Sequence, residues 1–155
     1  MVKQAAARAG IEIEIKAIPA SVFFSSDVSN LDTNVRFLAD LQTYTTFTGL
    51  DPQFFMAQFV SWELPFRENN WTGRNIARWR NTTFDQLWRQ AEVEMDPVKR
   101  AALFIKMNDL VVQSAVVVPV TWRNVLHAAA NTLGGIEING WDSIFGRIAY
   151  WYRQG

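Results

Sequence analysis

Residues with the chemistry to bind a small molecule are concentrated between positions 40 and 80. The segment 62–80 interleaves tryptophans with arginines and asparagines, and Pro65 and Gly73 indicate that it is irregular. Aromatic planes, guanidinium groups and amides can stack on a small polar ligand and hydrogen-bond to it. The same side chains can also fasten a long loop to its own domain, with arginines stacked on tryptophans. The sequence therefore indicates either a binding wall or a self-anchored loop.

Asp40 is a second polar feature, because its neighbours Phe37, Leu38, Ala39 and Leu41 are apolar. A carboxylate in such a run must point into water, cap a helix or find a partner. We expect residues 35–41 to form a strand, so the direction of the Asp40 side chain decides between these roles.

No motif in the sequence supports catalysis or metal binding. Nucleophile-elbow, zinc-protease and phosphate-loop motifs are absent, and so is cysteine. His127 is the only histidine, and no metal ligand or orienting partner lies near it in the sequence. We expect His127 to be structural or exposed. The prediction is that the chain is not an enzyme and has no metal and no cofactor.

Length and charge narrow the class of protein further. A chain of 155 residues has the size of one domain with its own core, so we expect a single domain over residues 1–155. Fifteen basic residues balance fifteen acidic residues, which predicts neither nucleic acid nor an anionic membrane as a partner. No apolar run is long enough to cross a bilayer.

Two consecutive helices between residues 81 and 115 are the best-specified elements. Thr83 is the expected N-cap of the first, and Asp96 followed by Pro97 predicts the start of the second. Asp51 and Pro52 repeat this pattern and predict a helix over 52–60. The first long helix should bury Phe84, Leu87, Trp88, Ala91 and Met95, and the second should present a broad apolar stripe ending near residue 115.

Strands are expected around these helices. Isoleucines at 11, 13 and 15 alternate with charged residues, which is typical of a half-buried strand, and the run 116–118 is rich in β-branched valine. Further strands are expected over 35–41 and 120–125 and around Ile136 and Ile138, with tight turns at 133–135 and 139–140. A helix over 2–9 precedes the first strand, so a βαβ unit is implied whose own first strand is absent. The expected fold class is α/β, with a mixed sheet covered by helices.

The order of these pieces resembles a known family. The pattern N-x-x-F-D-x-L-x-x-x-A-x-x-E-x-D-x-x-K-R over 81–100, with Leu103 and a valine-rich segment ending at Pro119, resembles the C-terminal lobe of the extracytoplasmic substrate-binding proteins of peptide and nickel ABC transporters. The segments GIEIEIKAIP and FLADLQ also look like that lobe, so the resemblance covers nearly the whole chain. Members of the family are much longer than this chain.

The resemblance implies one lobe of a type II periplasmic-binding-protein-like fold, from a longer two-lobed protein located outside the cytoplasm. It implies that a peptide or similar small polar ligand binds between two lobes, and that permease subunits and the missing N-terminal lobe are partners. Asp40 matches an aspartate that pairs with the α-ammonium of peptide ligands, but the following TYTTFTGL departs from many such binders and leaves the ligand unidentified. The candidate ligand contacts are Asp40, Tyr44, Asn75, Arg78 and Trp79.

An alternative from a different class is a free-standing interaction module. Its aromatic loop and its aromatic tail over 141–152 would then hold a protein partner, or a second copy of the chain through exposed apolar surface.

Overall fold

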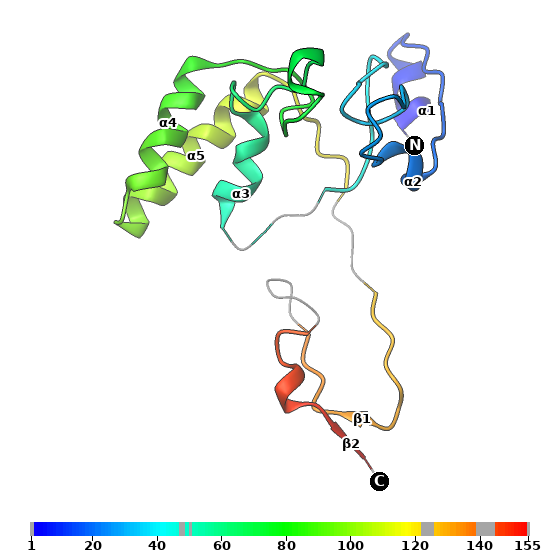
Figure 1. Ribbon diagram of the computed structural model, residues 1–155, viewed down its shortest axis with the longest axis vertical. Helices are drawn as coiled ribbons and strands as arrows, with labels where there is room; N and C mark the ends of the chain where they lie inside the picture. Colours follow the sequence, from blue (N-terminus) through cyan, green and yellow to red (C-terminus); the bar gives the residue numbers. More distant parts are fainter. Residues whose placement is uncertain (1, 47–48, 50, 122–125, 139–144, 155) are drawn as a thin grey trace.

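The computed structural model describes residues 2–46, 49, 51–121, 126–138 and 145–154. Its largest feature is a pair of helices, α4 (Thr82–Val93) and α5 (Pro97–Gln113), which lie side by side (Figure 1). Helix α3 (Pro52–Met56) continues as a 3-10 turn, η1 (Ala57–Phe59), and packs against both long helices. A loop with a second 3-10 turn, η2 (Arg67–Asn69), connects η1 to α4. We call residues 51–114 the helical unit.

Side-chain caps explain where these helices begin. Asp96 accepts hydrogen bonds from two backbone N–H groups at the start of α5, and Pro97 is the first helical residue. Asp51 caps α3 in the same way, so both predictions are confirmed. The predicted cap of α4 is wrong by two positions, because Asn81 rather than Thr83 accepts a backbone N–H of the first turn, at 3.0 Å.

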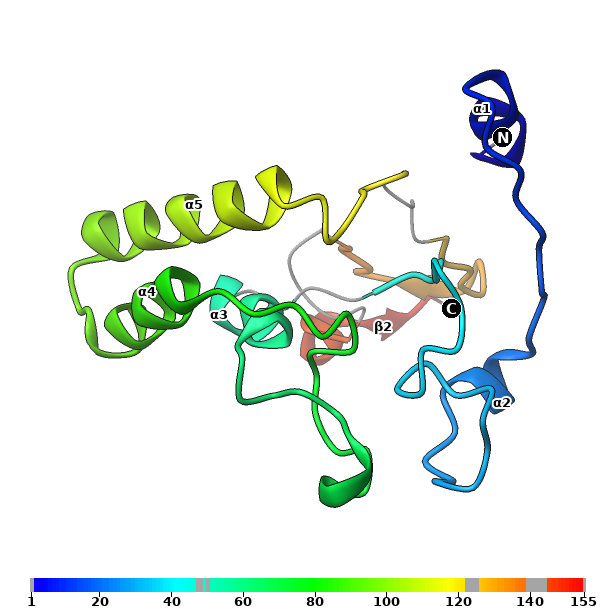
Figure 2. The ribbon, with the colours of Figure 1, turned by 90° about the horizontal axis from the view of Figure 1, so that it is seen from above.

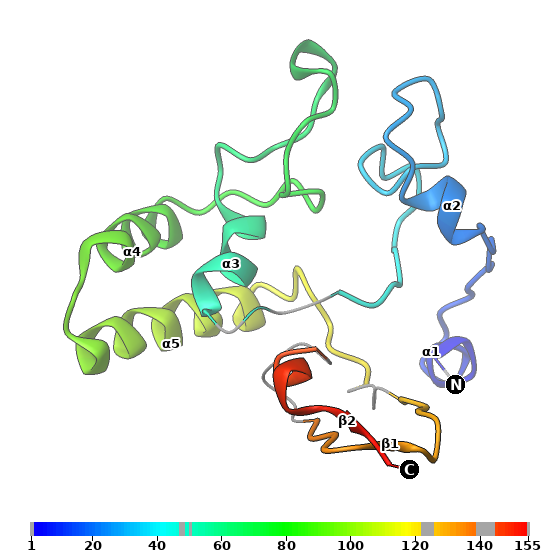
Figure 3. The same ribbon diagram turned by 60° about the horizontal axis from the view of Figure 1, so that its bottom comes forward.

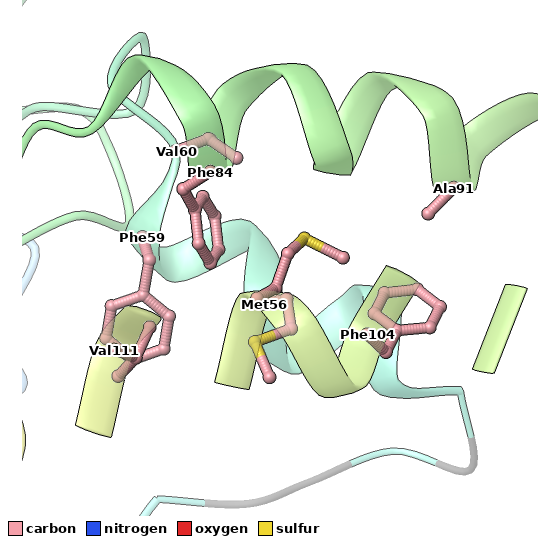
Figure 4. Close-up of a cluster of buried hydrophobic side chains, with 8 residues drawn as sticks. Met56, Phe59, Val60, Phe84, Ala91, Phe104 and Val111 are labelled. Atoms are coloured by element: carbon pink, nitrogen blue, oxygen red, sulfur yellow. The ribbon is translucent and has the colours of Figure 1, made fainter. Parts of the chain in front are cut away.

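The core of the helical unit lies where α3, α4 and α5 meet (Figure 4). Phe84 and Met107 are fully buried at its centre, and the rings of Phe59 and Phe84 meet edge to face with centroids 6.1 Å apart. The predicted buried face of α4 is confirmed except at Met95, which is 90% exposed because the helix ends at Val93. The buried residues of the cluster are Met56, Phe59, Val60, Phe84, Ala91, Phe104, Met107 and Val111.

The N-terminal segment contains two short helices, α1 (Val2–Arg8) and α2 (Ala20–Phe23), and α1 lies far from the helical unit (Figure 2). The predicted strand over 11–15 is wrong. These residues form no strand in the described part of the chain, and Ile11 and Ile15 are 58% and 70% exposed. Alternation predicts which side of a strand is apolar, but a strand forms only beside a partner. None of the described segments pairs with this one.

The predicted strands at 35–41 and 116–118 are also wrong. Residues 34–36 form a turn, and Phe37 adopts a left-handed backbone with φ of 49°, which interrupts an extended run. After α5, Ala115 has φ of 53°, and Val118 and Val120 that follow are 70% and 60% exposed without forming a strand.

The strands of the described residues are β1 (Leu133–Gly134) and β2 (Tyr152–Arg153), which pair antiparallel with Leu133 opposite Arg153. This pair of strands lies apart from α4 and α5 (Figure 3). The predicted turn over 133–135 is wrong at Leu133 and Gly134, which form β1, and the predicted strand positions Ile136 and Ile138 lie in no strand. Gly135 follows β1 with φ of 75°. A Cβ added there would lie 2.3 Å from the carbonyl oxygen of Tyr150, so the position requires glycine.

The remaining predictions of the C-terminal region have mixed outcomes. Residues 122–125, most of the predicted strand over 120–125, and the turn at Asn139–Gly140 lie outside the described residues. His127 is exposed, as expected. A 3-10 turn, η3 (Ile148–Tyr150), precedes β2, and the tail rings of Phe145 and Tyr150 are 56% and 67% exposed.

Helices together with a small two-stranded sheet make this a mixed α/β chain. No helix among the described residues is long and apolar enough to cross a membrane.

Candidate functional site

Asn75 is the buried polar centre of the loop between η1 and α4. Its side chain is fully buried, and its Nδ2 donates to the backbone carbonyls of Val60 at 3.0 Å and Trp79 at 2.7 Å. Its Oδ1 accepts the backbone N–H of Trp79 at 3.2 Å, and its own backbone N–H donates to the carbonyl of Glu63 at 2.8 Å. Asn75 therefore fastens both ends of the loop to the core, and this arrangement occupies both polar atoms of its side chain.

Trp79 belongs to the core rather than to an open surface. Its ring is half-buried and lies edge to face with Phe84 at 5.3 Å and Phe59 at 6.4 Å between centroids. A ring in this position stabilises the start of α4. Its predicted role as a stacking surface for a ligand stays a prediction.

Arg78 joins the loop to the N-terminal segment. Its Nη2 donates to the carbonyls of Val35 at 2.9 Å and Arg36 at 3.3 Å, and its backbone is left-handed with φ of 54°. The guanidinium groups of Arg36 and Arg78 both lie over the ring of Trp71, at 4.0 and 5.9 Å from its centroid. Arg78 over Trp71 is the kind of arginine–tryptophan contact that the sequence predicted within this loop, and Arg36 adds a second cation from the N-terminal segment.

Tyr44 and Asp40 lie on the stretch of chain between α2 and α3. The Tyr44 ring packs against Phe23 and Phe24 with centroids 5.6 and 5.8 Å apart, and burial raises the pKa of the Tyr44 phenol. The phenol therefore stays protonated at neutral pH and can donate a hydrogen bond. Asp40 is exposed, which fits the solvent-facing alternative, and its predicted role as a charge partner of a ligand stays a prediction.

A cleft of about 230 Å³ opens beside Tyr44, between the N-terminal segment and the helical unit. We call it the junction cleft. Of the five predicted ligand contacts, Tyr44 lines it, and Asn75 lies between two lining residues of the loop. Asp40, Arg78 and Trp79 do not line it. Its walls consist of Asn34, Val35, Tyr44, Thr46, Phe54, Phe55, Gln58, Gly73, Arg74 and Ile76.

Arg74 is the charged residue that lines the junction cleft, and it was not among the predicted ligand contacts. Its guanidinium carbon lies 4.4 Å from the centroid of the Phe54 ring, and its backbone N–H donates to Glu63 Oε2 at 3.2 Å. The preceding Gly73 has φ of 147°, and a Cβ there would meet the Glu63 carbonyl oxygen at 2.3 Å. The sequence signal for Arg74 was a glycine followed by an arginine in an aromatic loop. The sequence alone does not show that Phe54 lies beside Arg74.

A second hollow of about 440 Å³ lies between α4 and α5. Val93, Glu94, Lys99 and Lys106 are among its lining residues, and it contains none of the predicted ligand contacts. Within the described residues, no group of histidine, cysteine or carboxylate side chains is arranged to hold a metal ion.

The junction cleft thus combines one cation, several hydrogen-bonding groups and aromatic walls, which are the kinds of side chain that line small-molecule sites. No protein-family model, curated protein or solved structure matches the chain, so its function has to be argued from these residues.

Proposed function

We propose that the chain is the C-terminal ligand-binding lobe of an extracytoplasmic solute-binding protein that serves an ABC importer. The observation that carries the proposal is that the family-like pattern over 81–100 falls on two helices that pack together. Asn81 caps α4, Asp96 and Pro97 start α5, and Ala91 and Phe104 pack in the core between the helices.

The segments flanking the helical unit support the proposal. Residues 11–15 and 116–120 have strand-forming composition, yet neither segment forms a strand paired with another described segment. Exposed apolar side chains such as Ile15, Leu38 and Val118 are expected where a mixed sheet is completed by residues outside this chain. In the proposal these segments are strands of one lobe of a type II periplasmic-binding-protein-like fold.

The mechanism in the proposal is closure of two lobes around a peptide or similar small polar ligand, followed by presentation to permease subunits. This lobe supplies one wall, with Asp40 and Tyr44 on the connecting stretch. A site shared by two lobes loses most of its burial when one lobe is absent. The isolated chain should therefore bind trialanine at least about 100-fold more weakly than the intact protein, as measured by calorimetry.

The proposal is tested in cells that produce the protein. An antibody against the helical unit should detect a polypeptide well above 17.7 kDa in the extracytoplasmic fraction. Chemical cross-linking should join that polypeptide to the membrane-embedded subunits of an ABC importer. A cytosolic product of about 17.7 kDa would overturn the proposal. Cross-links confined to a soluble partner would also overturn it, in favour of the interaction module that uses the aromatic loop and tail.

A further inference from the structure

The lining of the junction cleft carries a single positive charge and no negative charge. Arg74 is the one ionised side chain among its lining residues at neutral pH, since the others are apolar, amide or hydroxyl groups. No ion pair joins Arg74 to a carboxylate in the described part of the chain. Glu63 is near, but its carboxylate accepts the backbone N–H of Arg74 and forms no ion pair with the guanidinium. The cleft therefore offers a guanidinium that forms no ion pair with any carboxylate of the described residues.

The position of the guanidinium is set by an aromatic ring. Stacking over Phe54 at 4.4 Å holds the planar group against one wall. The contact with Phe54 uses none of the guanidinium N–H groups as hydrogen-bond donors, and a guanidinium can bind a carboxylate through two parallel hydrogen bonds. Gly73 supports this placement, because its close approach to the Glu63 carbonyl brings two parts of the loop backbone together directly before Arg74.

The other walls fit a flat apolar body. Phe54, Phe55 and Tyr44 contribute three aromatic rings, and Val35 and Ile76 add aliphatic surface. Rings at such sites favour offset or edge-to-face contact with an aromatic ligand. A volume of about 230 Å³ is below the range of about 300–1,000 Å³ that is usual for drug-sized ligands, so the ligand must be small.

We propose that the junction cleft binds small aromatic carboxylates, with the carboxylate on Arg74 and the ring between Phe54 and Tyr44. This inference goes beyond the proposed function, because the junction cleft is lined by residues of this chain, whereas the ligand site in that proposal is shared by two lobes. An open cleft of this size should bind weakly, with a Kd of about 1 mM in the isolated chain.

The test is a titration of the full ¹⁵N-labelled chain with phenylacetate, followed by backbone amide shifts. Phenylacetate should shift the amides of Tyr44, Gly73, Arg74 and Ile76 in a saturable way. Phenylacetamide, which has the same shape without the charge, should bind at least about fivefold more weakly. Shifts confined to other residues, no saturation at about 20 mM, or equal affinity for the two probes would overturn the inference.

Two arginine variants locate the carboxylate. Arg74→Gln should weaken phenylacetate binding about fivefold or more, whereas Arg80→Gln, an exposed arginine of the same loop outside the cleft, should change it less than about twofold. Equal losses in both variants would mean non-specific attraction and would overturn the assignment. The comparison of the two probes needs no variant, so it decides the question even if Arg74→Gln unfolds. Failure of this test leaves the localisation and cross-linking test of the proposed function unaffected.

Discussion

The helical unit and the segments on either side of it are both rich in large apolar residues, but they use them differently. Every hydrophobic core residue of the described chain lies between Met56 and Val111. Outside that range Ile15, Leu38 and Val118 are 70%, 69% and 70% exposed. The difference shows that apolar composition gives a core only where each segment finds its partner within the chain. Substitutions in the two regions should therefore differ widely in their cost to stability.

The largest expected effect is at Phe84. Phe84→Ala removes a fully buried ring from between Phe59 and Trp79 and should lower the free energy of unfolding by about 3–5 kcal/mol. Phe24→Ala is the matched control, because Phe24 is 53% exposed in the N-terminal segment, and it should cost less than about 1 kcal/mol. Urea unfolding followed by far-UV circular dichroism measures both. Similar costs for the two variants would remove the contrast between the regions.

The next effect separates a structural role from a binding role at Asn75. Asn75→Ala leaves the buried Val60 and Trp79 carbonyls without their donor and should lower the free energy of unfolding by about 1–3 kcal/mol. Asn108→Ala, on the exposed side of α5, should change it by less than about 0.5 kcal/mol. Urea unfolding again gives the values. A stable Asn75→Ala protein that loses only ligand binding would support the predicted ligand contact instead.

A smaller effect is expected at the start of α3. Partial burial works to raise the pKa of Asp51, but the Gln53 N–H, together with the hydrogen bond and the charge of Arg100, outweighs it, so the pKa is lowered. A lowered pKa stabilises the fold above the unfolded-state value of about 4, and this contribution is lost as the pH falls through the folded-state value. Because the Asp51 side chain is 54% exposed, it amounts to less than about 1 kcal/mol.

Asp51→Asn tests that contribution while keeping a side-chain cap for the helix. The wild-type chain should lose more stability than Asp51→Asn between pH 7 and about pH 3, by less than about 1 kcal/mol. A pH dependence that is the same in the wild-type chain and in Asp51→Asn would show that the ionised Asp51 side chain contributes nothing measurable to stability.

The helices were predictable because their signals are local. A cap, a proline and an apolar period of three to four residues lie within about twenty positions, and the partner of α4 is the next helix along the chain. The errors at the boundaries have local causes too. Asn81 is an equally good capping residue two positions before Thr83, and the extended backbone at Glu94, with ψ of 117°, ends α4 before Met95.

The strands and the cleft could not be predicted in the same way. Alternation at 11–15 defines an apolar side but not a partner, and the left-handed backbone at Phe37 is invisible in composition. The junction cleft depends on contacts across more than forty residues, such as that between Arg78 and Val35. Arginine–tryptophan stacking within this loop was one of the two predicted alternatives, and Arg78 over Trp71 shows it. The sequence did not predict that Arg74 would stack on Phe54 instead.

The smallest expected effect tests the outlying segments directly. Ile15 is 70% exposed and unpaired, so Ile15→Ala should change the free energy of unfolding of this chain by less than about 0.5 kcal/mol. Val60→Ala, which removes two methyl groups from a side chain that is 1% exposed, should cost about 2 kcal/mol although the deletion is smaller. Urea unfolding of both variants decides the point. A cost above about 1 kcal/mol at Ile15 would mean that the segment 11–15 packs in solution, and the contrast between core and outlying segments would then no longer hold.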